Sequence, residues 1–212
     1  MRSKKAVSKR VNPTAGLHVA RLKQILDYGL QVDKNNPEPG VEKVEFVWEL
    51  PEELHTFKED LGEQPLHVSR LYVNQISKKT FLGIAIKGMT GQDWDPEEDL
   101  DTLLDKLCQL HIELEEDGEY TNAQIKTILP LSKDQQKKKY PTYSDAFVFD
   151  MSSFDQDIFD SLPEWKQKKI QKSKTYAEAL ADAKPKAKVA AKATPAPAAS
   201  KAAKELFKAK KK

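Results

Sequence analysis

The chain has 212 residues, of which 39% are hydrophobic and 32% charged, and its formal net charge is +2. This composition is typical of one globular domain with polar appendages, and it excludes a membrane-spanning segment because the longest apolar runs are only a few residues. The single cysteine, Cys108, excludes an internal disulfide and favours a reducing, cytoplasmic setting. No apolar stretch follows the basic start MRSKKAVSKR, so we expect no secretory signal.

The small net charge conceals a strong division along the chain. Residues 1–12 carry +5, residues 166–212 carry +12, and the residues between them carry −15. An acidic body thus lies between two basic arms, an asymmetry that often marks nucleic-acid-binding proteins, although the usual arrangement has a basic body. We divide the chain into a basic N-terminal arm (1–14), a folded domain (15–145), an acidic-aromatic segment with a helix (146–180) and a disordered Lys/Ala/Pro tail (181–212).

The apolar pattern of the first third of the folded domain is that of β-strands. The first predicted strand, LHVARLKQILDYGLQ, is long, and Gly29 near its end indicates a bend or a bulge. The second, VEKVEFVWEL, alternates cleanly, and LHVSRLYVNQI is a third alternating strand. One side of the second strand carries Val44, Phe46, Trp48 and Leu50.

The pattern then changes to that of helices. In SKKTFLGIAIKGM, Ser77 is a candidate N-cap and Gly88 a candidate stop, and DWDPEEDLDTLLDKL predicts a second short helix. LCQLHIELEE and EYTNAQIKTILPL return to a strand pattern, and Asp117-Gly118 between them predicts a hairpin. The fold predicted from this order is mainly β, a five-stranded OB-type Greek-key barrel with a helical insertion between strands 3 and 4. An SH3-like barrel or a small sandwich is the alternative.

After the predicted barrel, the stretch FVFDMSSFDQDIFDSLPEWKQKKIQKSKTY changes from acidic and aromatic to basic. Asp160 or Ser161 can cap a helix in which Pro163 suits the first turn. Two interpretations of the aromatic part stay open. Either its Phe residues dock on a partner protein or compete with nucleic acid, or they pack a C-terminal helix pair onto the barrel. The candidate partner-binding residues are Phe149, Phe154 and Phe159.

Four pieces of the chain, taken in order, carry a resemblance to a known family. They are ARLKQILDYG, VEFVWELP, SRLYVNQISKKTFLG and LPEWKQKKIQKS, and together they cover roughly residues 15 to 176. They resemble a family of bacteriophage OB-fold single-stranded-DNA-binding proteins. The resemblance implies that the protein coats single-stranded DNA without sequence preference during phage DNA replication or recombination, in the bacterial host cytoplasm. Replication or recombination proteins are then the candidate partners. Such proteins often end in an acidic tail, whereas this chain ends in a basic one.

A surface that binds single strands needs aromatic rings that stack on bases and cations that pair with phosphates, on one exposed groove. Strand alternation places Arg70 and Tyr72 on one face of strand 3, and we expect Leu71 and Val73 to point inward. Trp48 is either a stacking residue or part of the core. The pattern does not distinguish DNA from RNA. The predicted nucleic-acid-binding residues are Arg21, Lys23, Lys43, Trp48, Arg70, Tyr72, Lys87 and Lys126, and the basic tail is expected to add phosphate contacts.

Catalytic and metal-binding patterns are absent from the sequence. Cys108 and His111 are three apart on a predicted strand and therefore face opposite sides. DWDPEEDLD lacks the Gly and the final Glu of an EF-hand loop, and there is no P-loop, dinucleotide fingerprint or nucleophile elbow. We therefore expect no enzyme activity, no cofactor and no metal. The alternative to nucleic-acid binding is an OB-like protein-interaction or assembly module.

Overall fold

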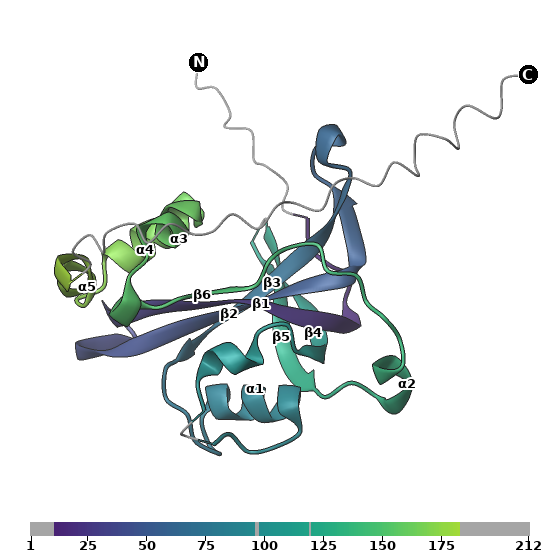
Figure 1. Cartoon of the computed structure of the whole chain (residues 1–212), viewed down its shortest axis with the longest axis horizontal. Coiled ribbons are helices and arrows are strands. Elements are labelled where there is room, and N and C mark those ends of the chain that lie inside the picture. The colour runs from purple at the N-terminus through teal and green to yellow at the C-terminus, as the bar shows by residue number, and fades with distance from the viewer. Residues whose placement is uncertain (1–10, 96–97, 119, 183–212) are drawn as a thin grey trace, which may run out of the picture.

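The alternating segments of the sequence form strands in a computed structural model of the chain, which describes residues 11–95, 98–118 and 120–182. The predictions for most of the N-terminal arm and for the tail from residue 183 onward lie outside the described residues. The described part is mainly β, as the sequence predicts, with a sheet that has helices on both of its faces (Figure 1). No described helix is long and apolar enough to cross a membrane.

The sheet has six strands: β1 (Gly16–Asp33), β2 (Asn36–Thr56), β3 (Glu63–Val73), β4 (Leu107–Asp117), β5 (Tyr120–Leu129) and β6 (Phe147–Phe149). The α-helices are α1 (Phe81–Thr90), α2 (Lys133–Gln136), α3 (Gln156–Ser161), α4 (Glu164–Gln171) and α5 (Tyr176–Asp182). Three short 3-10 turns complete the described elements: Glu59–Leu61, Leu100–Leu103 and Met151–Ser153. The second predicted helix is therefore only a 3-10 turn.

The strands follow the order β3-β2-β1-β4-β5, and each neighbouring pair is antiparallel. β1 is the central strand: β2 lies along one of its edges, and β4 pairs with its first half along the other. The short β6 continues that second edge in parallel, with Gln24 opposite Phe147. β6 was not predicted from the sequence, because three residues are too few to show a period of two.

β1 is a long strand with bulges, one of them at Gly29, as the sequence indicates. Its pairing with β2 shifts register at three places, one of them between Asp27 and Gly29. Gly29 has a φ of +63°, which a residue with a side chain rarely adopts, and a Cβ there would lie 2.1 Å from Oγ1 of Thr175. The bulge therefore bends β1 and also lets the chain just before α5 come close to it.

One face of the sheet packs with α1 around the main core. The side of β2 that carries Phe46 and Trp48 lies in this core, and the Phe46 ring is 5.8 Å from that of Trp48. Helix α1 begins at Thr80, whose side chain accepts the Gly83 N–H, and not at Ser77. The helix also continues through Gly88. A Cβ on this glycine would lie 2.2 Å from the Ile128 carbonyl oxygen, so its role is close packing of α1 on β5.

The opposite, outer face of the sheet is covered by the C-terminal segment (Figure 1). Phe149 and Phe159 are 1% and 2% exposed, and they form an aromatic cluster with Phe154 and Tyr176 against Leu26 of β1. The interpretation in which these Phe residues are free to dock on a partner is therefore wrong for Phe149 and Phe159, and the packing interpretation holds. As a result, β1 and β2 are buried on both faces over their central residues.

Candidate nucleic-acid interface

Two aromatic residues predicted to bind nucleic acid lie in the main core. Tyr72 is 3% exposed and its ring is 5.7 Å from that of Phe46, whereas Val73 is 45% exposed. The expectation that Tyr72 points outward is therefore wrong. Alternation shows which residues share a face, but it does not show which face is buried. Trp48 has no exposed surface, so of its two interpretations the structure supports the core.

Arg70 instead connects β3 and β5, the two outer strands in the order of the sheet. It lies on β3, and its guanidinium donates a 2.8 Å hydrogen bond to the carbonyl of Ile125 on β5. The same group lies 5.4 Å from the centre of the Tyr72 ring and 5.5 Å from that of Phe81. Arg70 is half-buried, and it holds together two strands that share no backbone ladder among the described residues.

The predicted lysines neutralise carboxylates of the acidic body. Lys23 is fully buried and pairs with Asp105 at 2.7 Å, which is a correction to its expected exposure, because the bulge in β1 turns it inward. Lys43 pairs with Asp33 at 2.9 Å, and Lys126 pairs with Glu115. Lys87 shares Asp93 with Lys78, and these two bonds lower the pKa of Asp93 to about 2. These lysines are therefore already paired with carboxylates.

Arg21 holds the segment that connects β5 to β6. It is buried on β1, and its guanidinium donates to the carbonyl oxygens of Tyr140 at 2.9 Å and Pro141 at 3.2 Å. Arg21 thus has a structural role in the described chain: it fixes residues 140–141 against the outer face of the sheet.

A groove with a volume of ≈ 290 Å³ remains open on this outer face, and we call it the Trp165 groove. Its floor includes Gln24, Val47 and Ser69, which are paired in register and so form one row across β1, β2 and β3. One wall is formed by Pro163, Trp165 and Lys166 at the start of α4. The groove thus crosses the three strands instead of following one of them.

Two buried carboxylates of β2 hold the segments on either side of the Trp165 groove. On the α4 side, Glu45 accepts a 2.8 Å hydrogen bond from the Tyr28 hydroxyl and forms a 2.8 Å ion pair with Lys166. On the other side, Glu49 accepts a 2.9 Å hydrogen bond from the Ser144 hydroxyl. The change from acidic to basic sequence at Lys166 therefore has a structural reason, since Lys166 neutralises Glu45 under α4.

Trp165 is the large aromatic residue at the edge of this groove. It is 58% exposed, because Lys166 and Ile170 occupy the buried side of α4 and leave the indole beside the groove. Lys169 and Lys172 follow it at helical spacing of four and seven residues. Trp165 was not among the predicted binding residues, although a tryptophan beside a run of lysines was the available signal.

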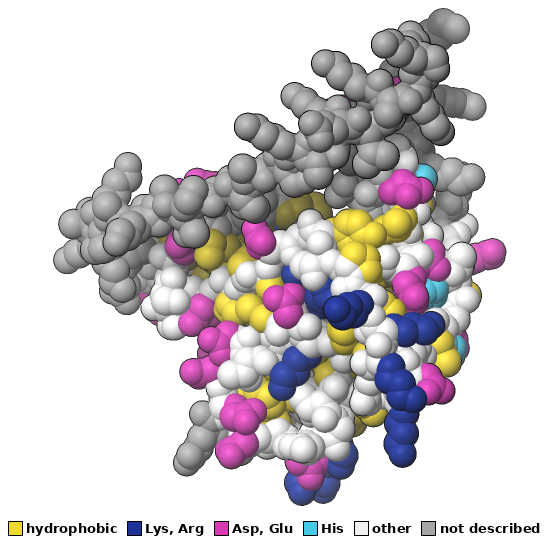
Figure 2. All heavy atoms as spheres, turned by 45° about the vertical axis from the view of Figure 1, so that its right-hand side comes forward, with side chains coloured by type: hydrophobic (Ala, Val, Ile, Leu, Met, Phe, Trp, Pro, Cys, Tyr) yellow, Lys and Arg dark blue, Asp and Glu magenta, His cyan; other side chains and the backbone are white. Residues whose placement is uncertain are grey.

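A second feature missed from the sequence is the lysine segment, residues 133–139. It has four exposed lysines and one acid, and it reads KDQQKKK. Its helix α2 begins with a capping box between Ser132 and Gln135. The face on the α2 side of the molecule has Lys and Arg side chains gathered over its middle and lower part, with Asp and Glu mainly at its margins (Figure 2). The run KKK before Tyr140 was the sequence signal for this basic surface.

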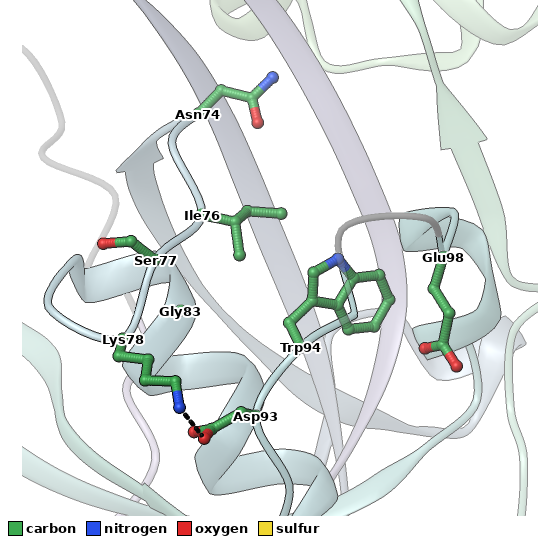
Figure 3. Close-up of a pocket in the computed structure, with 8 residues that line it drawn as sticks. All are labelled: Asn74, Ile76, Ser77, Lys78, Gly83, Asp93, Trp94 and Glu98. Atoms are coloured by element: carbon green, nitrogen blue, oxygen red, sulfur yellow. Dashed lines mark ion pairs between the residues drawn. The ribbon is translucent and has the colours of Figure 1, made fainter.

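A larger pocket of ≈ 510 Å³ lies next to α1, between the chain that follows β3 and the residues around Trp94. Figure 3 shows the Trp94 ring between Ile76 and Glu98, with Lys78 directed at Asp93. Trp94 packs on the main core and is half-buried. The pocket is thus separate from the Trp165 groove.

The remaining chemistry of the described residues is limited. No group of three or more His, Cys, Asp or Glu among them could hold a metal ion. Burial raises the pKa of the Cys108 thiol to about 12, so it is a poor nucleophile. The sequence matches no known protein-family model and no curated protein. The geometry of the Trp165 groove and the distribution of charge are therefore the features that point to a function.

Proposed function

We propose that this protein binds single-stranded DNA without sequence preference, through an OB-type barrel formed by the first five strands. The order β3-β2-β1-β4-β5 supports this proposal, because a five-stranded Greek-key barrel arises when the two outer strands of that order meet. The Arg70 hydrogen bond to Ile125 joins these two outer strands, and α1 lies between β3 and β4 in the chain, as expected of an OB-type barrel.

The observation that carries the proposal is the Trp165 groove. It crosses β1, β2 and β3 on the outer face, which is the face that OB domains use for oligonucleotides. An exposed indole offers a surface on which any base can stack. Lys169 and Lys172 beside it and the exposed lysines of the lysine segment offer charge to the phosphates. Because stacking is tolerant of base identity, we expect binding with little sequence preference.

The first test measures binding of fluorescent oligo-dT by anisotropy, beside a duplex of equal length, for wild type and Trp165→Ala. Base stacking contributes about 1–3 kcal/mol per base, so we expect Trp165→Ala to weaken binding by about 5- to 150-fold. The matched control is Phe81→Ala, which removes another exposed ring, 73% exposed on α1, and should change affinity little. Equal affinity for single strand and duplex, with no effect of Trp165→Ala, would instead favour a protein-interaction or assembly module.

A further inference from the structure

A third groove, of ≈ 680 Å³, lies where the middle of β1 and β2, at Ile25, Asp27 and Val44, meets the turns Leu100–Leu103 and Met151–Ser153. We call it the acidic groove. Its apolar lining consists of Ile25, Val44, Leu100, Leu104, Val148 and Phe149. Five carboxylates also line it: Asp27, Glu98, Asp99, Asp101 and Asp150. None of its described lining residues is Lys, Arg or His, so the groove combines apolar surface with uncompensated negative charge.

The carboxylates on one side of this groove have no partner among the described residues. Asp27 accepts a hydrogen bond from the Met151 N–H, and Asp150 accepts one from the Ser152 N–H, so both carboxylates have backbone partners. In contrast, the side chains of Glu98, Asp99 and Asp101 make no hydrogen bond or ion pair with any described residue. Elsewhere on the body, acids such as Asp33, Asp93 and Glu115 are paired with nearby lysines. The occupant that fits is therefore a cationic peptide with a few apolar side chains.

We propose that this occupant is the C-terminal end of the same chain, residues 204–212, KELFKAKKK. Five lysines against one glutamate give this segment a charge of +4, and its Leu206 and Phe207 are the only leucine and phenylalanine after Leu180. The two apolar side chains suit the apolar lining, and the lysines on both sides of them suit the carboxylates. Few other nine-residue stretches of the chain combine these properties.

The place where the described chain ends brings this segment within reach. Helix α5 ends at Asp182 and packs against the turn Met151–Ser153, and Ser153 lines the acidic groove. The 21 residues between Asp182 and Lys204 can span up to about 70 Å when extended, so the connection does not restrict the docking. The proposal concerns a contact within the free protein and does not depend on DNA binding.

The test places a nitroxide spin label at Ala209→Cys of the full-length, isotope-labelled protein and measures the broadening of its amide NMR signals. The native Cys108 is fully buried and does not compete for the label. At low salt we expect broadening at Leu100–Leu104 and Val148–Asp150. It should disappear at about 0.5 M salt, where screening acts over only a few ångströms. A mixture of spin-labelled unenriched chains with unlabelled isotope-enriched chains distinguishes a contact within one chain from docking on a second copy.

Charge variants complete the experiment. The double variant Asp99→Lys/Asp101→Lys reverses two exposed carboxylates of the groove, and we expect it to lose the broadening at low salt. The matched control, Glu116→Lys/Asp117→Lys, makes the same charge change at the β4–β5 hairpin and should keep it. Four outcomes would overturn the proposal. In the wild type at low salt, they are uniform or absent broadening, and broadening on another surface. The other two are broadening only in the mixture of chains, and equal loss of broadening in both variants.

Discussion

Single residues of this protein have roles set by the face of the sheet on which they lie. Cys108 lies on β4 in the main core and has no exposed surface. Burial raises the pKa of its thiol to about 12, and burial likewise raises the pKa of the Tyr28 and Tyr72 hydroxyls. All three groups thus stay protonated in the folded protein at pH values where they ionise in the unfolded chain.

We expect the free energy of unfolding to fall as pH rises above about 9. The sign follows from proton binding: above that pH the unfolded chain holds fewer protons than the folded protein, so alkali favours unfolding. Urea unfolding between pH 7 and 10.5 measures this effect, and Tyr28→Phe should reduce the slope above pH 10. Rapid reaction of native Cys108 with a thiol reagent at pH 8 would contradict the enclosure of the thiol.

The Glu45–Lys166 pair is the residue-scale contact between α4 and the sheet. Lys166→Ala leaves the Glu45 carboxylate buried with only the Tyr28 hydroxyl as a partner, and the loss of one member of a buried pair costs about 3–5 kcal/mol. We expect a loss of unfolding free energy at the lower end of that range. Glu45→Gln combined with Lys166→Met should lose less. The control Lys168→Met removes an exposed pair and should change stability by less than about 0.5 kcal/mol.

At the scale of elements, α1 depends on one close approach. Gly88 lies where a Cβ would meet the Ile128 carbonyl oxygen of β5. We expect Gly88→Ala to destabilise the protein by about 1–3 kcal/mol, although alanine is the better helix former, because the helix must move away from the strand. Urea unfolding measures the change. Ile84→Ala on the exposed side of α1 is the control, and a stabilised Gly88→Ala variant would show that the helix is free to shift.

The positions of the strands could be predicted from the sequence better than which face of each strand is buried. The alternation of β2 and the pattern of β4 and β5 predict strands that the structure contains, because each has a period of two with turn residues at its ends. The side of β3 on which Tyr72 lies could not be decided in the same way. Near the end of β3 both sides of the strand mix polar and apolar character, with Arg70 and Tyr72 on one side and Leu71 and Val73 on the other, so the sequence does not indicate which side faces the core. Trp165 was missed for a related reason: its exposure depends on how α4 sits on the sheet.

At the scale of the whole molecule, charge is separated between body and tail. Residues 183–212 contain ten lysines and one acid, whereas the body pairs most of the lysines that were expected to bind DNA. Under the proposed function, the groove supplies the preference for single strands, and the tail and the lysine segment supply charge that does not depend on sequence.

We expect truncation after Asp182 to keep the preference for single-stranded over duplex DNA and to reduce the salt dependence of binding. Each phosphate contact that is lost should lower the slope of log K against log salt by about 0.7. Anisotropy titrations over a salt series measure this slope. Replacement of Lys137, Lys138 and Lys139 by Gln is the comparison variant, because it removes charge from the described body instead. An unchanged slope after truncation would mean that the tail does not touch DNA.

The covering of the outer face by residues that come late in the chain has a consequence for synthesis on the ribosome. β2 ends at Thr56 and α4 begins at Glu164, so the surface around Leu26 and Val47 is made about a hundred residues before its cover. At about 5–20 residues per second, that surface is bare for roughly 5–20 s on each nascent chain. Glu45 and Glu49, which the folded protein buries, lie on this surface, and we expect their charge to keep it hydrated during this interval and to limit aggregation with neighbouring chains.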